Sequence, residues 1–375
     1  MKNNIAFLGV KYFPSAGGTS RVVENIIKNL ASDYHISIYC YKNKLAGKHM
    51  KGIRTIQIPQ IPLGSFGVFL YYLFCTLHLL LFGKYDLVHV HKIDAAIFIP
   101  LLKRKFSIVA TSHESPYLRD KWSWLGRKYF FLCENIFINS SVTLTTISKP
   151  LSRLYQERFK VQVRYIPNGI SFESNLDYDA ADSILKKHEI KDNFLMFAAR
   201  RIMSSKGIHT FLSSLEYIDF KGSVLIAGDT SHSPRLVKKL INRHRGLDIK
   251  LTGYIRSLKI LLALVEKADL FIFPSETEGM SIMLLEVASV GTPVICSDIP
   301  ENREVFTEEE VNYFNNKDHI DLGNKIIEAD MCRKDLELKA GRAILKIKSS
   351  YSWERISKEY NSLYRSIIGS DKKEL

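Results

Sequence analysis

Short apolar runs alternate with helical patterns along most of the chain. Residues 5–10 (IAFLGV) form a β-rich run, and residues 20–31 (SRVVENIIKNLA) follow with apolar positions at helical spacing. The stripe consists of Val22, Val23, Ile26, Ile27 and Leu30. Similar runs follow, among them HISIYCY, GIRTIQI, DLVHVH, FSIVATSH and SVTLTTIS. Runs that are apolar on both faces and separated by helices are typical of a parallel sheet covered on both sides, so the pattern predicts an α/β fold.

The alternation pauses once, at residues 165–183 (YIPNGISFESNLDYDAADS). Pro167, Asn168 and Gly169 have turn chemistry, and the polar, acidic stretch after them is expected to connect two domains. The alternation then resumes with NFLMFAA, SVLIAG, DIKLTG, DLFIFP and PVICSD. Two such arrays predict two doubly wound, Rossmann-like domains with a cleft between them, where ligands bind at the carboxyl ends of strands. The expected segments are a first domain (1–168), a linker (169–192), a second domain (193–350) and a terminal segment (351–375).

The composition is that of a soluble globular protein, with 46% hydrophobic and 25% charged residues among 375. The first residues contain too few apolar positions for a signal peptide, so we expect a cytoplasmic protein. The five cysteines are scattered and odd in number, which favours reduced thiols in core positions. They are Cys40, Cys75, Cys133, Cys296 and Cys332.

The net charge of +14 lies wholly in the first half of the chain. Residues 1–165 contain 23 Lys and Arg against 8 Asp and Glu, whereas residues 166–375 contain 30 against 31. This asymmetry predicts an anionic partner, such as a membrane surface or a phosphorylated substrate. Ordinary solvated lysines are the alternative. Nucleic acid is disfavoured because no recognised binding module accompanies the charge.

Residues 66–83 (FGVFLYYLFCTLHLLLFG) carry no formal charge. The run is slightly short for a membrane span, which needs about 20 apolar residues. A spanning helix, a buried helix and a helix on a membrane surface are all compatible with this composition. For the surface helix, Tyr71 and Tyr72 are the expected interface residues.

Three segments have residue types suited to binding an anionic ligand. Gly17 and Gly18, between the first strand and the first helix, allow close approach of a ligand to backbone amides, although such glycines are also common in turns. Arg201 and Lys206 flank a polar loop after the first strand of the second array, where two cations can hold a diphosphate. Surface cations are common, so this segment alone is a weak signal.

The third segment is PSETEGMSIMLLEVASVGTP, residues 274–293. Backbone amides of Gly279, Met280, Ser281 and Ile282 would form an anion-binding helix start. Glu286 lies just over one turn into the apolar helix. A lone glutamate there is usually at the solvent edge. With Glu278 and the helix start nearby, the functional interpretation is a carboxylate that accepts hydrogen bonds from two adjacent ribose hydroxyls.

Six motifs, in order along the chain, resemble those of retaining glycosyltransferases with the GT-B fold, specifically the family 4 group (glycosyl transferases group 1). The segment from Glu278 to Glu286 resembles the E-x7-E region of this group. The other five are YFPSAGGTSRVV, DLVHVHK, TSHE, YIPNGI and RRIMSSKG, so that the resemblance extends over most of the chain.

The resemblance implies a role for each matching residue. Arg201 and Lys206 would hold the diphosphate of a nucleotide-sugar donor, Glu286 its ribose, and Glu278 the hydroxyls of the transferred sugar. The amides near Met280, Ser281 and Ile282 would contact phosphate or sugar. His113 would lie beside the sugar, with a loop-capping histidine as the structural alternative, and Gly17 and Gly18 would border diphosphate and acceptor.

The sequence departs from the family pattern at three places. Arg200 stands where the family usually has glycine, so the diphosphate cation is either Arg200 or Arg201. Met280 and Ser281 replace the usual Phe-Gly, which would alter the sugar pocket. Thr230 stands where a further glycine is often found, so the nucleobase loop would differ.

Two metal-like patterns occur in the sequence. His89 and His91 share one face of a strand, but no third ligand accompanies them. Asp177 and Asp179 form a D-x-D pattern within the expected linker, where we interpret it as accidental. The resemblance implies a reaction with no metal or other cofactor, because arginine and lysine stabilise the leaving group.

Taken together, the resemblance predicts a retaining hexosyltransferase. The second domain would bind a UDP- or GDP-sugar, the first an acceptor, and the terminal helix would pack back on the first domain. The expected acceptor is a polyprenyl-diphosphate-linked glycan in bacterial O-antigen, capsule or exopolysaccharide synthesis. The enzyme would dock on the anionic cytoplasmic face of the inner membrane. A GT-B epimerase or phosphorylase and a non-catalytic nucleotide-sugar-binding scaffold are the alternatives.

Overall fold

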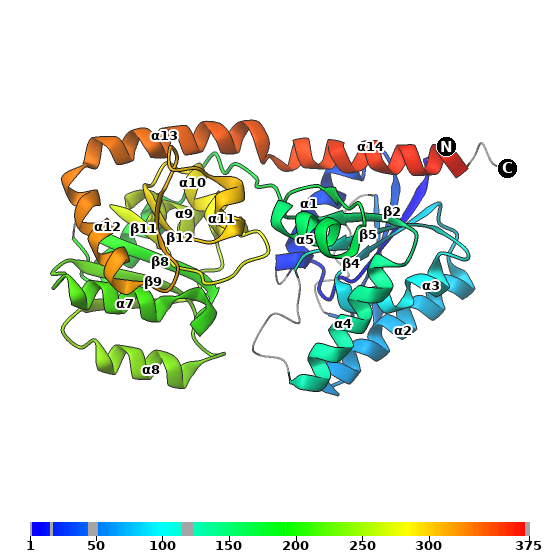
Figure 1. The fold of residues 1–375 in the computed structure, drawn as a ribbon, viewed down its shortest axis with the longest axis horizontal. Coiled ribbons are helices and arrows are strands. Elements are labelled where there is room, and N and C mark those ends of the chain that lie inside the picture. The colour runs from blue at the N-terminus through cyan, green and yellow to red at the C-terminus, as the bar shows by residue number, and fades with distance from the viewer. Residues whose placement is uncertain (1, 16–17, 44–51, 115–122, 192, 372–375) are drawn as a thin grey trace. The chain divides into compact units, whose positions relative to one another are not determined.

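The computed structural model describes residues 2–15, 18–43, 52–114, 123–191 and 193–371, with side chains through residue 369. The chain forms two compact units (Figure 1). Unit 1 consists of residues 1–169 and 353–375, and unit 2 of residues 170–352. Each unit is a parallel sheet with helices packed around it, so the predicted α/β class with two Rossmann-like domains is confirmed.

Unit 1 contains a seven-stranded sheet in the order β3-β2-β1-β4-β5-β6-β7, with parallel pairing throughout. Its strands are β1 (Asn4–Leu8), β2 (His35–Tyr41), β3 (Ile53–Ile58), β4 (Leu87–His91), β5 (Ser107–Ser112), β6 (Thr143–Thr146) and β7 (Arg164–Tyr165). Its helices are α1 (Gly18–Leu30), α2 (Gly64–Phe82), the 3-10 helix η1 (Ile93–Phe98), α3 (Ile99–Leu102), α4 (Trp124–Ile138), α5 (Lys149–Phe159) and α14 (Trp353–Asp371).

Unit 2 contains a six-stranded parallel sheet in the order β10-β9-β8-β11-β12-β13. Its strands are β8 (Phe194–Arg201), β9 (Ser223–Asp229), β10 (Asp248–Gly253), β11 (Leu270–Phe273), β12 (Val294–Asp298) and β13 (Asn312–Asn315). Its helices are α6 (Tyr178–Lys187), the 3-10 helix η3 (Ser204–Lys206), α7 (Ile208–Tyr217), α8 (Pro234–Arg243), α9 (Leu258–Lys267), α10 (Ile282–Ser289), α11 (Pro300–Val305), α12 (His319–Met331) and α13 (Arg333–Ser350).

Every β-rich run predicted from the sequence is a strand, whereas β7 and β13 were missed. Both are short edge strands of two and four residues, too short for a clear periodic pattern. Helix α1 buries the predicted stripe, because Val22, Val23, Ile26, Ile27 and Leu30 are all at most 3% exposed. The local pattern therefore determined both the strands and the face that this helix buries.

The chain crosses between the units at two neighbouring points. Gly169 ends the first segment of unit 1, and a Cβ placed on it would lie 2.9 Å from the backbone nitrogen of Trp353, where α14 begins. In unit 2, the amide of Ile170 donates to the carbonyl of Tyr351 at 2.7 Å. Helix α14 packs on α1 within unit 1. The glycine of the YIPNGI turn thus has a structural role, because it admits the returning chain.

Residues 169–192, expected to be a linker, are largely part of unit 2. They contain α6, which packs on α9, and Tyr178 at its start hydrogen-bonds Glu266 of α9. Asp177 is the N-cap of α6, accepting a hydrogen bond from the amide of Ala180 at 3.1 Å. The acidic composition of this stretch therefore reflects a capped surface helix of unit 2 rather than a connection between domains.

Helix α2 corrects the expectation for its two tyrosines. Tyr71 and Tyr72 are at most 1% exposed, and the Tyr71 hydroxyl donates to the carbonyls of Val10 and Tyr39. Burial raises the pKa of both hydroxyls. They are core residues, not interface residues, because the hydroxyls find partners inside unit 1. Among the cysteines, Cys332 is exposed, so its predicted core position was wrong, while the other four are buried and all five are free thiols.

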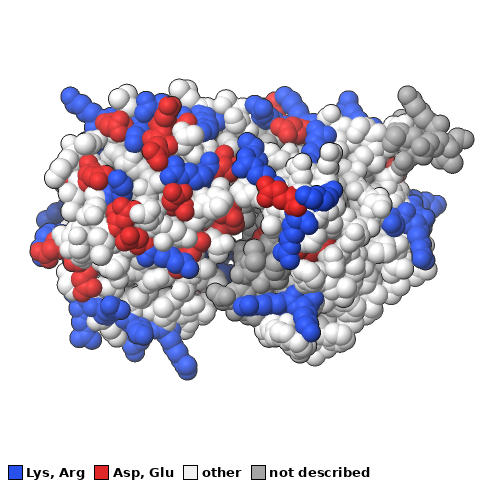
Figure 2. Space-filling view, in the orientation of Figure 1, with Lys and Arg blue, Asp and Glu red and all other residues white. Residues whose placement is uncertain are grey.

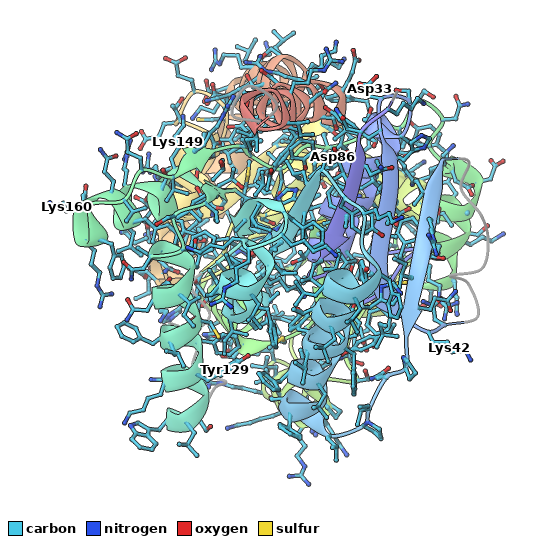
Figure 3. All side chains as sticks on the ribbon, turned by 90° about the vertical axis from the view of Figure 1, so that its right-hand side faces the viewer. Asp33, Lys42, Asp86, Tyr129, Lys149 and Lys160 are labelled. Carbon is cyan, nitrogen blue, oxygen red and sulfur yellow. The ribbon has the colours of Figure 1, made fainter. Side chains whose placement is uncertain are left out.

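The outer sides of α2 and α4 leave an apolar surface uncovered. By length and composition α2 is apolar enough to cross a membrane, a test that core helices also pass, and one third of the tested window is buried. Figure 2 shows a largely uncharged surface over these helices, with Lys and Arg at its edges. Figure 3 shows α2 and α4 on the same side of the sheet, with Tyr129 labelled on α4. We call this the α2–α4 surface; its exposed side chains are Phe66, Phe74, Leu77, Leu81, Phe82, Trp124, Leu125, Phe131 and Leu132.

Candidate functional site

In unit 2, the loop after β8 packs directly on the loop after β11. Gly207 ends η3 with φ +69°, and a Cβ there would lie 1.8 Å from the carbonyl oxygen of Pro274. The amide of Glu276 donates to the carbonyl of Ser205 at 3.0 Å. Only glycine allows this close approach without strain. The lysine-glycine pair in RRIMSSKG therefore brings Lys206 next to the segment that carries Glu278.

Lys206 and Glu278 form an ion pair between these two loops. The Glu278 side chain is 10% exposed and the Lys206 side chain 29% exposed. Because both lie at the carboxyl ends of neighbouring strands, they occupy the edge where open α/β sheets bind ligands. The structure thus brings together two predicted site residues that are 72 positions apart in the sequence.

Glu276 holds the same loop in place from several sides. Its carboxylate lies 3.3 Å from Nε2 of His209 and 3.3 Å from Nζ of Lys317. Its carbonyl accepts a hydrogen bond from the side-chain amide of Asn316 at 3.1 Å. The carbonyl of Ser275 accepts another from the hydroxyl of Ser297 at 2.5 Å. These contacts tie the Glu278 loop to β12, to α7 and to the residues that follow β13, which fixes the backbone leading to the ion pair.

Helix α10 begins at the predicted place. Ser281 is its N-cap, and the Ser281 hydroxyl accepts a hydrogen bond from the amide of Leu284 at 3.4 Å. Met280 is buried, and Gly279 is half-buried beside it. The capping bond takes up the amide of Leu284, so the amides of Ile282 and the residue after it remain the first-turn groups suited to an anion.

Glu286 lies inside unit 2 rather than at the solvent edge of α10. Only 1% of the residue is exposed. Carboxylates are rarely placed in such surroundings unless they have specific partners. Its burial therefore argues against an incidental surface glutamate.

Glu301, at the start of α11, lies close enough to Glu278 for their charges to interact, although nothing in the sequence pattern singled it out. Burial raises its pKa, and the nearby charge of Glu278 raises it further. The position is half-buried. Its signal in the sequence is the helix start after PVICSD, but nothing in the local pattern connects it to Glu278, because the connection depends on how the loops pack.

Both candidate arginines stand at the carboxyl end of β8. Arg200 and Arg201 are exposed, and neither side chain has an ion pair within the described residues. The register with β9 shifts between Ala198 and Arg201, so that three steps on β8 match two on β9. Such a bulge re-aims side chains at the end of a strand.

In unit 1, His113 lies at the end of β5 beside two buried histidines of β4. His91 is fully buried, and its Nδ1 lies 3.0 Å from Nε2 of His113, which is 9% exposed. Burial lowers the pKa of His113 to about 3, with a further contribution from the charge of Lys92. Burial also lowers the pKa of His89 and His91 well below the usual value. All three rings are therefore neutral near pH 7.

His89 has no ring nitrogen left for a metal. Its Nδ1 lies 2.6 Å from the Tyr364 hydroxyl of α14, and its Nε2 lies 2.6 Å from the Thr111 hydroxyl. Across the parts of the chain that the structure describes, no cluster of three His, Cys, Asp or Glu side chains could hold a metal ion. The H-x-H pattern thus forms a hydrogen-bonded network beneath His113.

Gly18 is the first residue of α1, and Gly17 lies outside the described residues. A Cβ placed on Gly18 would have no heavy atom within 4 Å in the described structure. Packing of the protein itself therefore does not require glycine at this position. Gly9 is different, because it has φ +96° and its Cβ would lie 1.8 Å from the His91 carbonyl oxygen.

The whole chain resembles solved structures of GT-B proteins. Sucrose-phosphate synthase of Thermosynechococcus elongatus matches with a TM-score of 0.82 and 19% identity, over 98% of this chain and 100% of that one. HepE of Anabaena in complex with UDP-glucose matches with a TM-score of 0.77 and 14% identity, over 100% of both chains. At these identities the likeness shows the fold.

Two family models cover most of the sequence. The model for Glycosyltransferase Family 4 matches residues 16–174, and the model for Glycosyl transferases group 1 matches residues 192–329. The chain is a GT-B glycosyltransferase. The first match ends at residue 174, shortly after unit 2 begins at residue 170, and the second match starts at residue 192.

Curated relatives of this GT-B glycosyltransferase include proteins of archaea, bacteria and yeast. An uncharacterized glycosyltransferase of Methanocaldococcus jannaschii is 25% identical over 95% of this chain and 96% of its own length. The O-antigen chain mannosyltransferase of Salmonella typhimurium is 24% identical over 56% of both chains. A capsular polysaccharide biosynthesis glycosyltransferase of Staphylococcus aureus is 24% identical over 65% of this chain and 68% of its own.

Proposed function

We propose that this GT-B glycosyltransferase is a retaining hexosyltransferase that uses a UDP- or GDP-sugar. The observation that carries the proposal is the pairing of Lys206 with Glu278 beside the start of α10. A cation, a carboxylate and free first-turn amides in one place suit a sugar diphosphate, because the amides and the ammonium attract phosphate while the carboxylate accepts sugar hydroxyls. In this assignment Glu278 binds the sugar, and Lys206 with Arg201 binds the diphosphate.

In the proposed reaction, the bond between the anomeric carbon and the diphosphate oxygen breaks, and that oxygen keeps the electron pair. Lys206 and Arg201 stabilise the negative charge that develops there. The acceptor hydroxyl attacks on the face the diphosphate leaves, so that the anomeric configuration is retained. Its proton passes to the departing diphosphate, and no protein nucleophile is required. A neutral His113 suits a place beside the sugar, because it does not repel the developing positive charge.

The proposed ribose contact of Glu286 requires its carboxylate to become accessible, because only 1% of the residue is exposed in the structure. Two adjacent hydroxyls would then each donate to the carboxylate. We propose that arginine and lysine act on the leaving group without a metal ion, so that the nucleotide sugar is a co-substrate and no separate cofactor takes part.

We propose bacterial surface polysaccharide synthesis as the setting, with a polyprenyl-diphosphate-linked glycan as acceptor. The names of the Salmonella and Staphylococcus relatives, which concern O-antigen and capsule, support this setting. The UDP-glucose held by HepE supports a nucleotide-sugar donor. Donor base, sugar and linkage depend on the pocket around Met280 and Ser281, where the sequence departs from the family pattern.

We further propose that the enzyme works at the cytoplasmic face of the inner membrane. The support is the α2–α4 surface, where exposed Leu, Phe and Trp side chains lie among cations. Lys103, Arg104, Lys105, Arg127 and Lys128 are all exposed, while Lys121 lies outside the described residues. Apolar side chains rimmed by cations suit an anionic lipid leaflet.

The proposal is tested by incubating purified enzyme with a panel of UDP- and GDP-sugars and a bacterial lipid extract. We expect nucleoside diphosphate release from one donor, with loss of about 100-fold or more in Glu286→Ala and Lys206→Ala. The anomeric configuration of the product, read by NMR, tests retention. Inversion would refute the retaining mechanism while leaving the transferase assignment intact.

Three outcomes would favour the alternatives. Conversion of the nucleotide sugar without any acceptor product would indicate an epimerase, and a requirement for inorganic phosphate would indicate a phosphorylase. The non-catalytic scaffold would be supported if calorimetry detects nucleotide binding but no donor of the panel releases nucleoside diphosphate in the presence of the extract. Full activity in Glu286→Ala would refute the ribose role.

A further inference from the structure

The hydrogen bond between His91 and His113 joins a buried residue of β4 to the histidine that follows β5. Nδ1 of His91 lies 3.0 Å from Nε2 of His113, and His91 is completely buried. Both rings are neutral, so each carries one ring proton. Exactly one of the two facing nitrogens must therefore be protonated for this bond to form.

The second ring nitrogen of His91, Nε2, indicates which of the two facing nitrogens carries the proton. Within the described residues, Nε2 of His91 is buried and has no hydrogen-bond partner. A buried N–H group without an acceptor is rarer in proteins than a buried acceptor without a donor. The favoured tautomer of His91 therefore carries its proton on Nδ1 and donates it to His113. In that case Nε2 of His113 is the acceptor, and the proton of His113 is on Nδ1.

We propose that His91 is a positioning residue that fixes the tautomer and ring orientation of His113. His113 then presents Nδ1–H as a hydrogen-bond donor to a hydroxyl oxygen of the donor sugar. The sugar contact rests on the proposed function, whereas the tautomer does not. His91 itself does not touch the sugar.

The surroundings of His91 hold its ring in one orientation. The ring stacks on Phe7 of β1 at a centroid distance of 5.9 Å and an interplanar angle of 16°. The ring of His89 lies on it at 3.9 Å, and His89 is itself held by Tyr364 and Thr111. The backbone carbonyl of His91 lies against Gly9, where no Cβ could fit. Because the His91 ring is constrained in this way, its hydrogen bond can fix the orientation of the His113 ring. Metal-binding histidines are oriented in the same manner by the group that bonds their second ring nitrogen.

The test uses two replacements of His91 with different hydrogen-bonding capacity. His91→Asn keeps an amide near the position of Nδ1, whereas His91→Phe keeps the ring that packs on Phe7 but removes the bond. We expect His91→Phe to raise the KM for the donor sugar or lower kcat by about 10-fold, and His91→Asn to restore most of the loss. If His91→Phe does not fold, His91→Gln, which moves the amide toward the position of Nε2, is compared with His91→Asn.

The tautomer is read directly from the ring nitrogens of ¹⁵N-histidine-labelled protein, with His113→Asn used to assign the signals. We expect Nε2 of His113 to be unprotonated and Nδ1 protonated in the wild type, and a mixture of tautomers in His91→Phe. His89→Phe serves as the matched control, because it keeps an aromatic ring against His91 and removes only the hydrogen bonds to Tyr364 and Thr111, neither of which involves His113. It should leave the His113 signals in the wild-type pattern.

Protonated Nε2 of His113 in the wild type would overturn the proposal. So would an unchanged tautomer and unchanged kinetics in His91→Phe. If the wild type turns over no donor sugar, the proposed function fails, while the NMR result still decides the tautomer. The two failures are therefore distinguishable.

Discussion

The ammonium group of Lys206 is paired with the carboxylate of Glu278 across the loops that follow β8 and β11. In the proposed complex the two groups bind different parts of one donor, Lys206 the diphosphate and Glu278 the sugar. The cation is thus paired with the carboxylate to which the proposal assigns the sugar. If that proposal holds, diphosphate binding competes with this ion pair.

Glu278→Gln should separate nucleotide binding from sugar transfer. Removing the carboxylate charge frees Lys206, so free nucleoside diphosphate should bind about 3- to 10-fold more tightly by calorimetry. Transfer of the sugar should fall by about 100-fold, because an amide accepts fewer hydrogen bonds than a carboxylate. Weaker binding of the nucleoside diphosphate in Glu278→Gln would contradict this account of the pair.

Arg200 and Arg201 are both exposed at the carboxyl end of β8, where the register with β9 shifts, and we expect their replacements to have unequal effects. We expect Arg201→Ala to raise the KM for the donor about 10-fold or more and Arg200→Ala to change it less than about 3-fold. The reverse order would assign the diphosphate contact to Arg200. Equal losses would mean that both cations contact the donor and would contradict the prediction.

Gly207→Ala should destabilise unit 2. The residue has a positive φ, and the new Cβ would meet the Pro274 carbonyl. We expect a loss of about 2 kcal/mol or more in the free energy of unfolding, measured by urea denaturation. Gly341→Ala is the matched control, because Gly341 is exposed within α13 and no atom lies near its Cβ position. That variant should be neutral or more stable by up to about 1 kcal/mol.

The α2–α4 surface should bind anionic vesicles through charge and apolar contacts together. Replacement of Lys103, Lys105 and Lys128 by glutamate should weaken binding to anionic vesicles. The binding free energy, measured by co-sedimentation, should become less favourable by about 1 kcal/mol or more for each residue. Leu81→Ser with Phe82→Ser should also weaken binding, because both side chains are about 70% exposed.

The control for vesicle binding reverses cations elsewhere on the chain. Lys238 and Lys239 are exposed on α8 of unit 2, and their replacement by glutamate should leave co-sedimentation close to that of the wild type. Wild-type binding in the triple charge reversal would refute a role for this surface. Equal loss in the α8 control would indicate a general effect of net charge.

The three neutral histidines of unit 1 predict lower stability in acid. Their pKa values are lowered in the folded protein, to about 3 for His113, so the unfolded chain takes up protons that the folded chain excludes. Below about pH 6.5 each such histidine should lower the free energy of unfolding by about 1.4 kcal/mol per pH unit, until the folded-state pKa is reached.

This dependence can be followed by tryptophan fluorescence, since the three tryptophans belong to unit 1. Urea unfolding of the wild type and of His91→Phe is compared at about pH 7.5 and about pH 5.5. The variant should show a pH slope smaller by about one proton. An identical slope would mean that His91 is protonated in the folded protein.

The hydrophobic pattern determined the α/β class, the two arrays and the strands, because strand and helix periodicities are local properties of the sequence. The order of the motifs then placed Lys206 and Glu278 after the ends of strands, and Glu286 within the helix α10. The same pattern could not show that Tyr71 and Tyr72 belong to the core, because apolar composition is nearly uniform around α2 and only neighbouring elements decide which side is covered.

Tertiary structure alone brought together groups that are distant along the chain. Lys206 meets Glu278, His91 bonds His113, and Glu301 lies within the electrostatic influence of Glu278. The tertiary structure also placed α6 in unit 2 and packed Gly169 against the start of α14. Periodicity records which face of an element is buried, but it contains no information on which residues of another element will lie opposite. Those contacts follow from sheet order and loop packing, which form only when the whole unit folds.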